Sequence, residues 1–456
     1  MITARDMAVA ATPPARAPFV PVQAGPLGRA GMATAAGRPP AFAGPNGFRT
    51  PATAAPLRER ILLVVLFVTV LASSVAFIEP SPHDGLMGVL AIAGLIAGMR
   101  FTRTLVMLLL CLVIWNVSGL ISLINVLDIE KTVQYAATSV YLAIAAILFA
   151  CLFSDNTLQR LTVMRAAYVI TAAAVAAAGI AGYFHAFPGA QMFAPSGRAL
   201  GAFKDPNVFG PFLIWPALFL AERILTRRIG LVDLGLLGVI LVGLLLSFSR
   251  GAWFHFVLSA TVMVTLTFVT APTKKTRLRI FTLSALSILA LAAAFVVLLS
   301  IPSVERMFEE RAHLINSYDV GHGGRFRLQE LAVTAVLNYP DGMGPFGFAT
   351  AQGLQQHNVY LQAFLVYGWV GGVAYIVLLL ATVYIGLRAS FIRTPWQPYA
   401  ITALAVFIGE MAEGFVIDTD HWRHFFLLLG ILWGCAAASI RHARSRPPLP
   451  LTVLRS

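Results

Sequence analysis

Residues 104–124 read TLVMLLLCLVIWNVSGLISLI and contain no charged side chain. An apolar stretch of this length is typical of a membrane-spanning helix, which needs about 20 residues. Similar stretches recur along the whole chain of 456 residues, of which 58% are hydrophobic and 12% charged. A soluble domain carries about 25% charged residues. The sequence therefore predicts an all-α, polytopic membrane protein, because the runs are too long and continuous for barrel strands.

Twelve apolar segments each predict one transmembrane helix, and the second and sixth are the shortest. Residues 1–56 precede them, are rich in Ala, Pro and Gly, and predict a disordered tail rather than a signal peptide. The segments cover 61–78, 85–99, 104–124, 132–153, 166–184, 207–221, 231–248, 251–271, 278–301, 359–386, 398–416 and 424–440.

Lys and Arg gather in every second connection, as they do on the cytoplasmic side of membrane proteins. With the N-terminus inside, the basic connections are 100–103, 154–165, 222–230, 272–279, 387–397 and the tail 441–456. Both termini are then cytoplasmic, and this pattern accounts for the net charge of +13 without nucleic acid. The expected order is a tail (1–56), helices one to nine (57–301), an outer loop (302–358), helices ten to twelve (359–440) and a second tail (441–456).

A small set of basic residues falls on the outside, where the same rule disfavours positive charge. These residues are the first candidates for binding an anionic ligand, because topology does not require them. They are Lys131, Arg198, Lys204, Arg250, Arg306, Arg311, Arg325, Arg327 and Arg423.

The outer loop contains one helical pattern. Apolar residues at 328, 331, 332, 335 and 336 follow Arg325 at helical spacing, and Tyr339-Pro340-Asp341-Gly342 ends the run. This predicts a short amphipathic helix on the outer surface of the membrane. Arg325 and Arg327 lie in its first turn, where backbone N–H groups favour an anion, and are candidates for phosphate binding.

Two further outside turns carry basic residues. In Gly197–Asn207, Arg198 and Lys204 supply positive charge and Asn207 is suited to cap the following helix. In Ser247–Trp253, Arg250 lies at the tip of a tight turn between two membrane segments. The alternatives are a solvated loop for the first turn and an arginine reaching lipid phosphates for the second.

Polar residues also occur at the ends of two late segments. His357 and Asn358 precede a long apolar helix, whose dipole disfavours imidazolium, so a neutral His357 is able to accept a proton. Glu410 and Glu413 are three residues apart in an apolar segment, where carboxylates face a polar cavity or a cation, and outside arginines are the expected partners. The alternatives are an inert loop histidine and a structural ion pair. No pattern calls for a metal or a cofactor.

These motifs occur in an order that resembles the O-antigen ligase/polymerase family of bacterial envelope glycosyltransferases. The resemblance covers about residues 198–372. It rests on Arg198-x-x-Gly201 with Asp205-Pro206-Asn207, Ser249-Arg250-Gly251-Ala252-Trp253, Gly324-Arg325 with Pro340-x-Gly342-x-Gly344, and His357-Asn358 with Gly368 and Gly371.

The resemblance implies an inner-membrane enzyme with a periplasmic active site. The family takes a glycan from an undecaprenyl-pyrophosphate carrier and passes it to lipid A–core, in ligases, or to another carrier-linked unit, in polymerases. Arg198 and Arg250 match the family's pyrophosphate-binding arginines, and Arg325 matches the arginine that opens the loop helix. His357 matches the histidine that acts on the acceptor hydroxyl. An aromatic residue often follows the loop arginine in the family, whereas Leu331 stands at that place here.

Three functions remain open from the sequence. A ligase is the first, and a polymerase of O-antigen or exopolysaccharide repeat units is the second. A polysaccharide-related transporter is the third, since twelve spans fit it and Glu410 with Glu413 resembles a proton relay. The transporter is disfavoured because the two halves lack matching helix-breaking Gly/Pro pairs.

Overall fold

The computed structural model describes residues 56–78, 80–126, 129–227, 229–312 and 324–445. Every regular element among these residues is helical, which confirms the all-α prediction. The predicted disordered tail, apart from its last residue, and the end of the C-terminal tail lie outside the described residues, as does the middle of the outer loop.

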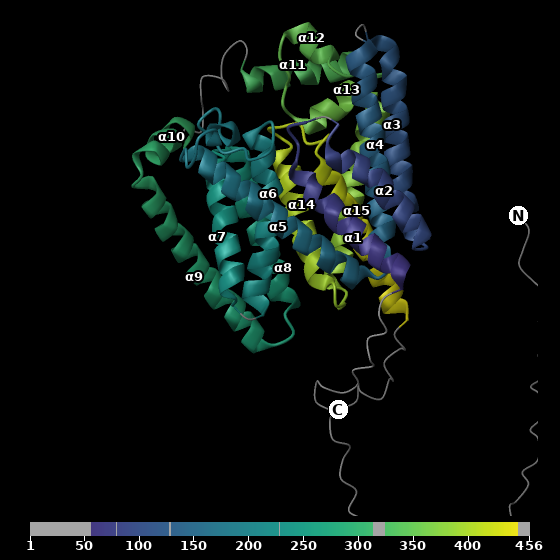
Figure 1. Ribbon diagram of the computed structural model, residues 1–456. Coiled ribbons are helices and arrows are strands. Elements are labelled where there is room, and N and C mark those ends of the chain that lie inside the picture. Colours follow the sequence, from purple (N-terminus) through teal and green to yellow (C-terminus); the bar gives the residue numbers. More distant parts are fainter. Residues whose placement is uncertain (1–55, 79, 127–128, 228, 313–323, 446–456) are drawn as a thin grey trace, which may run out of the picture. The chain divides into compact units, whose positions relative to one another are not determined.

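Each of the twelve predicted segments corresponds to one helix (Figure 1). These helices are α1 (Leu57–Leu71), α2 (Pro82–Ile96), α3 (Val106–Ser122), α4 (Ile129–Ser154), α5 (Thr157–Tyr183), α6 (Pro206–Thr226), α7 (Leu231–Leu246), α8 (Arg250–Thr270), α9 (Lys274–Leu299), α13 (Val359–Phe391), α14 (Gln397–Glu413) and α15 (Arg423–Arg444).

Eight of these helices are long and apolar enough to cross a membrane, so the chain is a multi-pass membrane protein. The other four are shorter: α1 and α2 have 15 residues each, α7 has 16 and α14 has 17. The count of twelve spans therefore stays a prediction.

Several helix boundaries differ from those predicted: α1, for example, ends at Leu71 instead of 78, and the fifth and sixth helices are longer than expected. The fifth helix begins at Thr157, nine residues before the predicted 166, because Arg160 does not remain in a solvated connection. Its guanidinium is buried and donates to both carboxylate oxygens of Glu59 at 2.9 Å. The sixth segment, predicted to be short, continues to Thr226, where the threonine hydroxyl donates to the Glu222 carbonyl.

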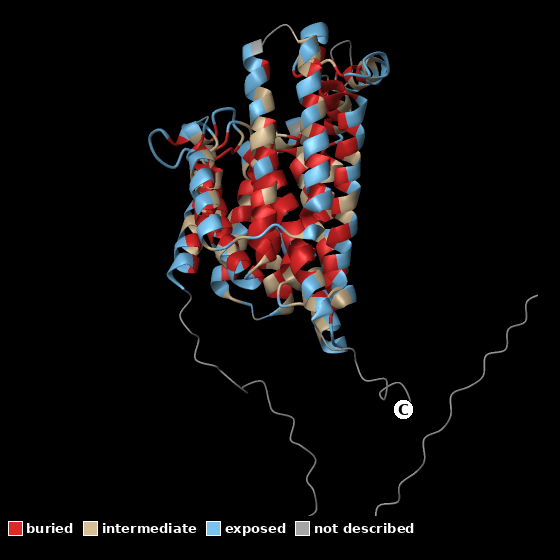
Figure 2. Ribbon diagram, turned by 90° about the vertical axis from the view of Figure 1, so that its right-hand side faces the viewer, coloured by how far each residue is buried: buried red, intermediate tan, exposed pale blue. Residues whose placement is uncertain are grey.

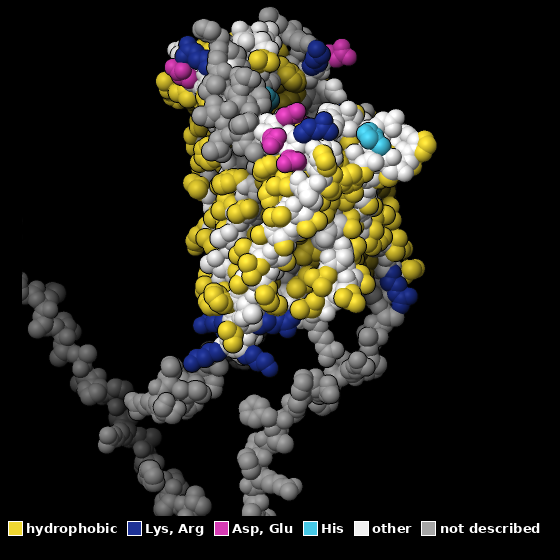
Figure 3. All heavy atoms as spheres, turned by 90° about the vertical axis from the view of Figure 1, so that its left-hand side faces the viewer, with side chains coloured by type: hydrophobic (Ala, Val, Ile, Leu, Met, Phe, Trp, Pro, Cys, Tyr) yellow, Lys and Arg dark blue, Asp and Glu magenta, His cyan; other side chains and the backbone are white. Residues whose placement is uncertain are grey.

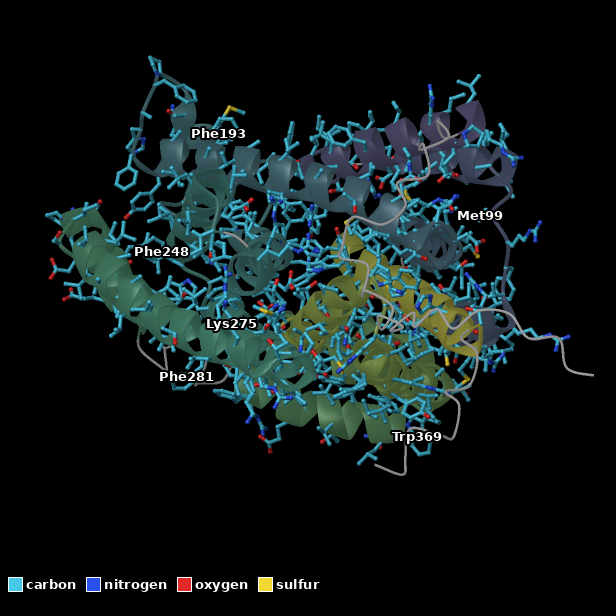
Figure 4. All side chains as sticks on the ribbon, turned by 90° about the horizontal axis from the view of Figure 1, so that it is seen from below. Met99, Phe193, Phe248, Lys275, Phe281 and Trp369 are labelled. Carbon is cyan, nitrogen blue, oxygen red and sulfur yellow. The ribbon has the colours of Figure 1, made fainter. Side chains whose placement is uncertain are left out.

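Burial divides the helices into an inner and an outer group (Figure 2). Among the eight long helices, α6 and α15 are the most enclosed, with 83% and 89% of their 18-residue apolar stretches buried. Helix α9 lies at the edge of the bundle (Figure 4): none of its 18-residue apolar stretch is buried, and Phe281 is exposed.

Charge is distributed unevenly between the two ends of the bundle. A belt of hydrophobic side chains separates a lower end rich in Lys and Arg from an upper end that carries acidic and basic side chains together (Figure 3). The helix order places 184–205, 247–249 and 414–422 at the same end as the outer loop. These connections are the ones that the sequence assigns to the outside.

Helices α8 and α14 approach each other closely because Gly409 has no side chain. A Cβ at this position would overlap the His255 ring and the Ser259 hydroxyl of α8. His255 is fully buried in this contact, and its Nε2 lies 3.0 Å from the Val406 carbonyl oxygen of α14. The end of α14 is thereby held against the first turns of α8.

We expect Gly409→Ala to destabilise the protein by about 1–3 kcal/mol, the usual cost of overpacking a filled interior. Gly238→Ala in α7 is the matched control, because no atom lies within 4 Å of its added Cβ. Alanine is the better helix former, so this control should melt at the same or a higher temperature. Thermal unfolding of the detergent-solubilised variants measures both; equal melting temperatures would contradict the packing argument.

The described residues of the outer loop form three helices, where the sequence predicts one. They are α10 (Pro302–Ala312), α11 (Arg325–Asn338) and α12 (Gly347–Gln352). Helix α11 is the predicted amphipathic helix and ends where the sequence predicts. Part of its apolar surface packs on protein, because Leu328 and Ala332 form a buried cluster with Phe348 and with Leu365 of α13. Phe326, Val333 and Leu337 of the same helix are exposed, so its position on the membrane surface stays a prediction.

A break in α13 anchors the segment that follows α11. Gly368 has φ 66° and ψ −176°, values outside the helical region. The turn 340–343 fits into this break: the Trp369 N–H donates to the Pro340 carbonyl at 2.8 Å, and the Met343 N–H donates to the Leu365 carbonyl at 2.6 Å. A Cβ on Gly368 would lie 2.7 Å from the Pro340 carbonyl oxygen, so glycine is required for both conformation and space.

Candidate active site

Arg198 is held at the outer end of α6 and α7. Its Nε donates to the Ser247 carbonyl at 2.9 Å, and its Nη2 donates to the Asn207 side-chain oxygen at 2.9 Å. The next residue, Ala199, donates its N–H to the Leu246 carbonyl. These contacts attach the α5–α6 connection to the α7–α8 turn and fix the direction of the guanidinium.

The first turn of α6 corrects one prediction. The cap of this helix is Asp205, whose carboxylate accepts the Asn207 N–H at 2.8 Å. Asn207 itself lies inside the helix, and its side chain positions Arg198. The carboxylate of Asp205 takes the capping place because it precedes Pro206, which begins the helix without needing a donor.

Arg250 begins α8 directly after a tight turn. Phe248 is buried with φ 47°, and Ser249 caps the helix by accepting the Ala252 N–H at 3.4 Å. A Cβ on Gly251 would lie 2.8 Å from Oε1 of Glu413. The glycine therefore lets the Glu413 carboxylate reach the residue next to Arg250.

His357 lies just before α13, which is capped by the Asn358 side chain. Its Nδ1 is 3.6 Å from Oδ2 of Asp418 in the α14–α15 connection. The His357 carbonyl accepts from Gln329 of α11 at 3.4 Å, so the helix that carries Arg325 is attached to the same point. Burial raises the pKa of Asp418, and hydrogen bonding to His357 opposes part of that rise.

One cavity of about 810 Å³ collects these residues, and we call it the arginine cavity. Its walls come from the α5–α6 connection, the α7–α8 turn, α11, the residue before α13, and the end of α14. Guanidinium groups, a histidine and carboxylates line it together with apolar residues. The charged or titratable lining residues are Arg198, Arg250, Arg325, His357, Asp205, Glu413 and Asp418.

Four residues that the sequence predicts for the site, Arg327, Lys204, Asn358 and Glu410, do not line the arginine cavity. Arg327 lies on the exposed side of α11, where it pairs with Glu330 at 2.7 Å. Lys204 lines a different cavity, and Asn358 serves as a helix cap. Glu410 is fully buried, with Oε1 3.4 Å from Nε2 of His424.

The sequence predicts arginines as the partners of Glu410 and Glu413. Among the described contacts, their partners are histidines. Glu413 is 2.8 Å from Nδ1 of His255, and both side chains are almost fully buried. Nε2 of His255 faces a carbonyl oxygen, which only accepts, so Nε2 carries a hydrogen. The contact between Nδ1 and Glu413 then contains one further proton, on either partner.

Sequence reasoning missed His255 and Asp418. His255 stands inside an apolar helix, but it is five residues after Arg250, which places it deeper along α8. Asp418 lies in the acidic stretch IDTD, which the topology places outside and which gives no signal for one aspartate over the other. Only the folded α14–α15 connection places Asp418 beside His357.

The O-antigen ligase family model matches residues 235–376. This region belongs to the O-antigen ligase/polymerase family. The match runs from α7 into α13 and includes Arg250, Arg325 and His357 of the arginine cavity, whereas Arg198 precedes it. A search of curated proteins finds no match to the chain.

We expect His255→Leu to lower the free energy of unfolding by about 3–5 kcal/mol, because it leaves the Glu413 carboxyl buried without its partner. Replacing both residues by leucine should recover part of this loss, since the unpaired polar group is then gone. Arg327→Gln is the control on an exposed pair and should cost less than about 1 kcal/mol. Unfolding of the purified variants tests this; equal losses for His255→Leu and Arg327→Gln would show that the buried pair is unimportant.

Proposed function

We propose that the protein transfers a glycan from an undecaprenyl-pyrophosphate carrier to a sugar hydroxyl of lipid A–core, at the periplasmic face of the bacterial inner membrane. The observation that carries this proposal is the convergence of Arg198, Arg250 and Arg325 on one cavity that also contains His357. Three guanidinium groups beside a histidine fit a pyrophosphate leaving group next to an acceptor hydroxyl.

The arginines suit the charge that develops during transfer. As the bond between the anomeric carbon and the phosphate oxygen breaks, negative charge grows on that oxygen. Fixed guanidinium groups stabilise this charge, remain protonated throughout and hold phosphate oxygens through pairs of N–H donors. Arg198 is already fixed by two hydrogen bonds, so little reorganisation is needed when the donor binds.

In this proposal, His357 accepts the proton of the attacking hydroxyl. Asp418 lies beside its Nδ1, so the opposite ring nitrogen, Nε2, is available to act as the general base. The acceptor oxygen forms the new bond to the anomeric carbon, its proton passes to His357, and the carrier pyrophosphate leaves with the electron pair of the broken bond. The energy comes from the pyrophosphate linkage, so the proposal requires no cofactor.

The position of the arginine cavity favours this proposal over transport. A transporter binds its substrate near the middle of the membrane. Here the cavity is built from connections at one end of the bundle, and Glu413 reaches it from the last turn of α14.

We expect Arg198→Ala and Arg250→Ala to lower turnover about 10²–10³-fold, as removal of a transition-state donor does. His357→Ala should lower it about 10²–10⁴-fold, the usual contribution of a general base. Arg327→Ala, on the exposed face of α11, is the control. Transfer by purified protein and gels of surface polysaccharide from complemented deletion strains measure these effects.

Wild-type transfer by all three cavity variants, at normal expression, would contradict the proposal. The deletion strain also identifies the acceptor. Loss of long glycan from lipid A–core with accumulation of carrier-linked polymer indicates a ligase. Lipid A–core with a single repeat unit indicates a polymerase.

We expect Asp418→Asn to lower kcat. Asp418 lies beside Nδ1 of His357, and an asparagine amide can donate a hydrogen bond to that nitrogen, which favours the tautomer with its hydrogen on Nε2. The loss in kcat should be smaller than that of His357→Ala, because the imidazole itself remains. Turnover of the purified variant measures this; a kcat equal to that of the wild type would exclude an influence of Asp418 on the base.

A further inference from the structure

A second cavity adjoins the arginine cavity and has a volume of about 210 Å³. It lies between the outer ends of α1, α2 and α6 and the start of α15. Asp205, Val208 and Trp422 line both cavities, so they form a shared wall. The volume is below the roughly 300–1,000 Å³ of a site for a drug-sized ligand, which suits one small ring rather than a lipid chain.

The two cavities are built from the same two connections. The α5–α6 connection directs Arg198 to the arginine cavity and Lys204 to the second cavity. The α14–α15 connection directs Asp418 to the arginine cavity and His421 to the second cavity. Trp422 of the same connection lines both. The two cavities are therefore neighbours, and one substrate can be proposed to reach both.

The lining of the second cavity combines aromatic faces with hydrogen-bonding groups. Tyr168, Phe203 and Trp422 are buried aromatic residues, each no more than 7% exposed. Lys204 and Arg423 contribute N–H donors to the lining and Asp205 contributes an acceptor. Aromatic faces beside a few placed polar groups suit a sugar, which has apolar C–H faces and polar hydroxyls.

This cavity has a preformed wall. Arg423 donates from Nε and Nη2 to the two oxygens of Asp84, at 2.9 and 2.8 Å. Asp84 also accepts the Ser81 N–H at the start of α2, and the Tyr141 hydroxyl of α4. In His83, Nδ1 lies 2.9 Å from the Thr69 carbonyl oxygen, so Nδ1 carries the hydrogen in the neutral ring and Nε2 is left as an acceptor.

We propose that the second cavity is a sugar-binding subsite, which holds one saccharide unit of a glycan substrate while the reacting linkage lies in the arginine cavity. This inference rests on the proposed function. The unit belongs either to the donor glycan, next to its pyrophosphate, or to the acceptor. Both sources present the same chemistry, a pyranose with hydroxyl groups, and kinetics distinguish them.

The test uses the full-length protein in lipid nanodiscs with two kinds of probe. Undecaprenyl pyrophosphate without sugar reports the arginine cavity alone. The carrier-linked glycan and the acceptor, both extracted from a deletion strain, report the whole site. The variants are Lys204→Met, which removes a donor, and Ala76→Phe, which fills the second cavity from a half-buried position in its wall. Arg306→Met removes an exposed outer charge that lines neither cavity and is the control.

We expect both variants to bind undecaprenyl pyrophosphate as the wild type does, which also shows that they fold. The KM of one glycan substrate should rise about tenfold, the effect of losing roughly 1.4 kcal/mol of binding, with little change in kcat. A rise for the donor assigns the subsite to the donor glycan, and a rise for the acceptor assigns it to the acceptor.

Unchanged KM values for both substrates, with undecaprenyl pyrophosphate still bound, would overturn the sugar subsite and leave the proposed function intact. Failure of the wild-type protein to bind undecaprenyl pyrophosphate would overturn the proposed function itself. A fall in kcat alone would also count against the subsite, because the second cavity would then affect the reacting groups rather than sugar binding.

Discussion

The close approach of α8 and α14 is the contact on which the site depends. Gly409 admits the ring of His255, and Gly251 admits the carboxylate of Glu413, so two missing side chains make room for one buried polar pair. The pair lies next to the turn that carries Arg250. It also fixes the end of α14, from which the 414–422 connection leads to Asp418 and Trp422. A small change in helix spacing would therefore move residues on both cavities together.

Electrostatics explain why this arrangement needs support from the fold. Three guanidinium groups around one cavity repel each other, and the predicted topology gives no reason for positive charge at this end of the bundle. Asp205, Glu413 and Asp418 line the same cavity and offset this repulsion. Each acidic residue also has a local structural contact: Asp205 caps α6, Glu413 contacts His255, and Asp418 lies beside His357. The polar groups are held in place before a ligand binds, which is the arrangement that favours transition-state stabilisation.

Much of the fold could be predicted from the sequence, because apolar runs, charge bias and helix-ending turns are local signals. The twelve helix positions and the limits of α11 follow from them. The start of α5 could not be predicted, since it depends on a buried pair between Arg160 and Glu59, 101 residues apart. The packing of α11 on α13 could not be predicted either, because periodicity shows that a helix has an apolar face but not which element covers it.

The sequence identifies the outer basic residues as candidates for the site, but it does not show which of them line the same cavity. Arg198 and Lys204 are six positions apart in one connection, yet they line different cavities, because backbone direction decides where each side chain points. Several family motif residues have structural roles instead: Gly342 and Gly368 let the turn after α11 fit into the break in α13. No local sequence pattern identifies His255, because its role depends on a contact with α14, which begins more than 140 residues later.

The central claim is that the arginine cavity holds the pyrophosphate of a lipid carrier. An electron cryomicroscopy map of the protein in nanodiscs with undecaprenyl pyrophosphate tests it most directly. The account predicts density for two phosphate groups between Arg198, Arg250 and Arg325, within reach of His357. Density for the pyrophosphate elsewhere, with this cavity empty, would contradict it.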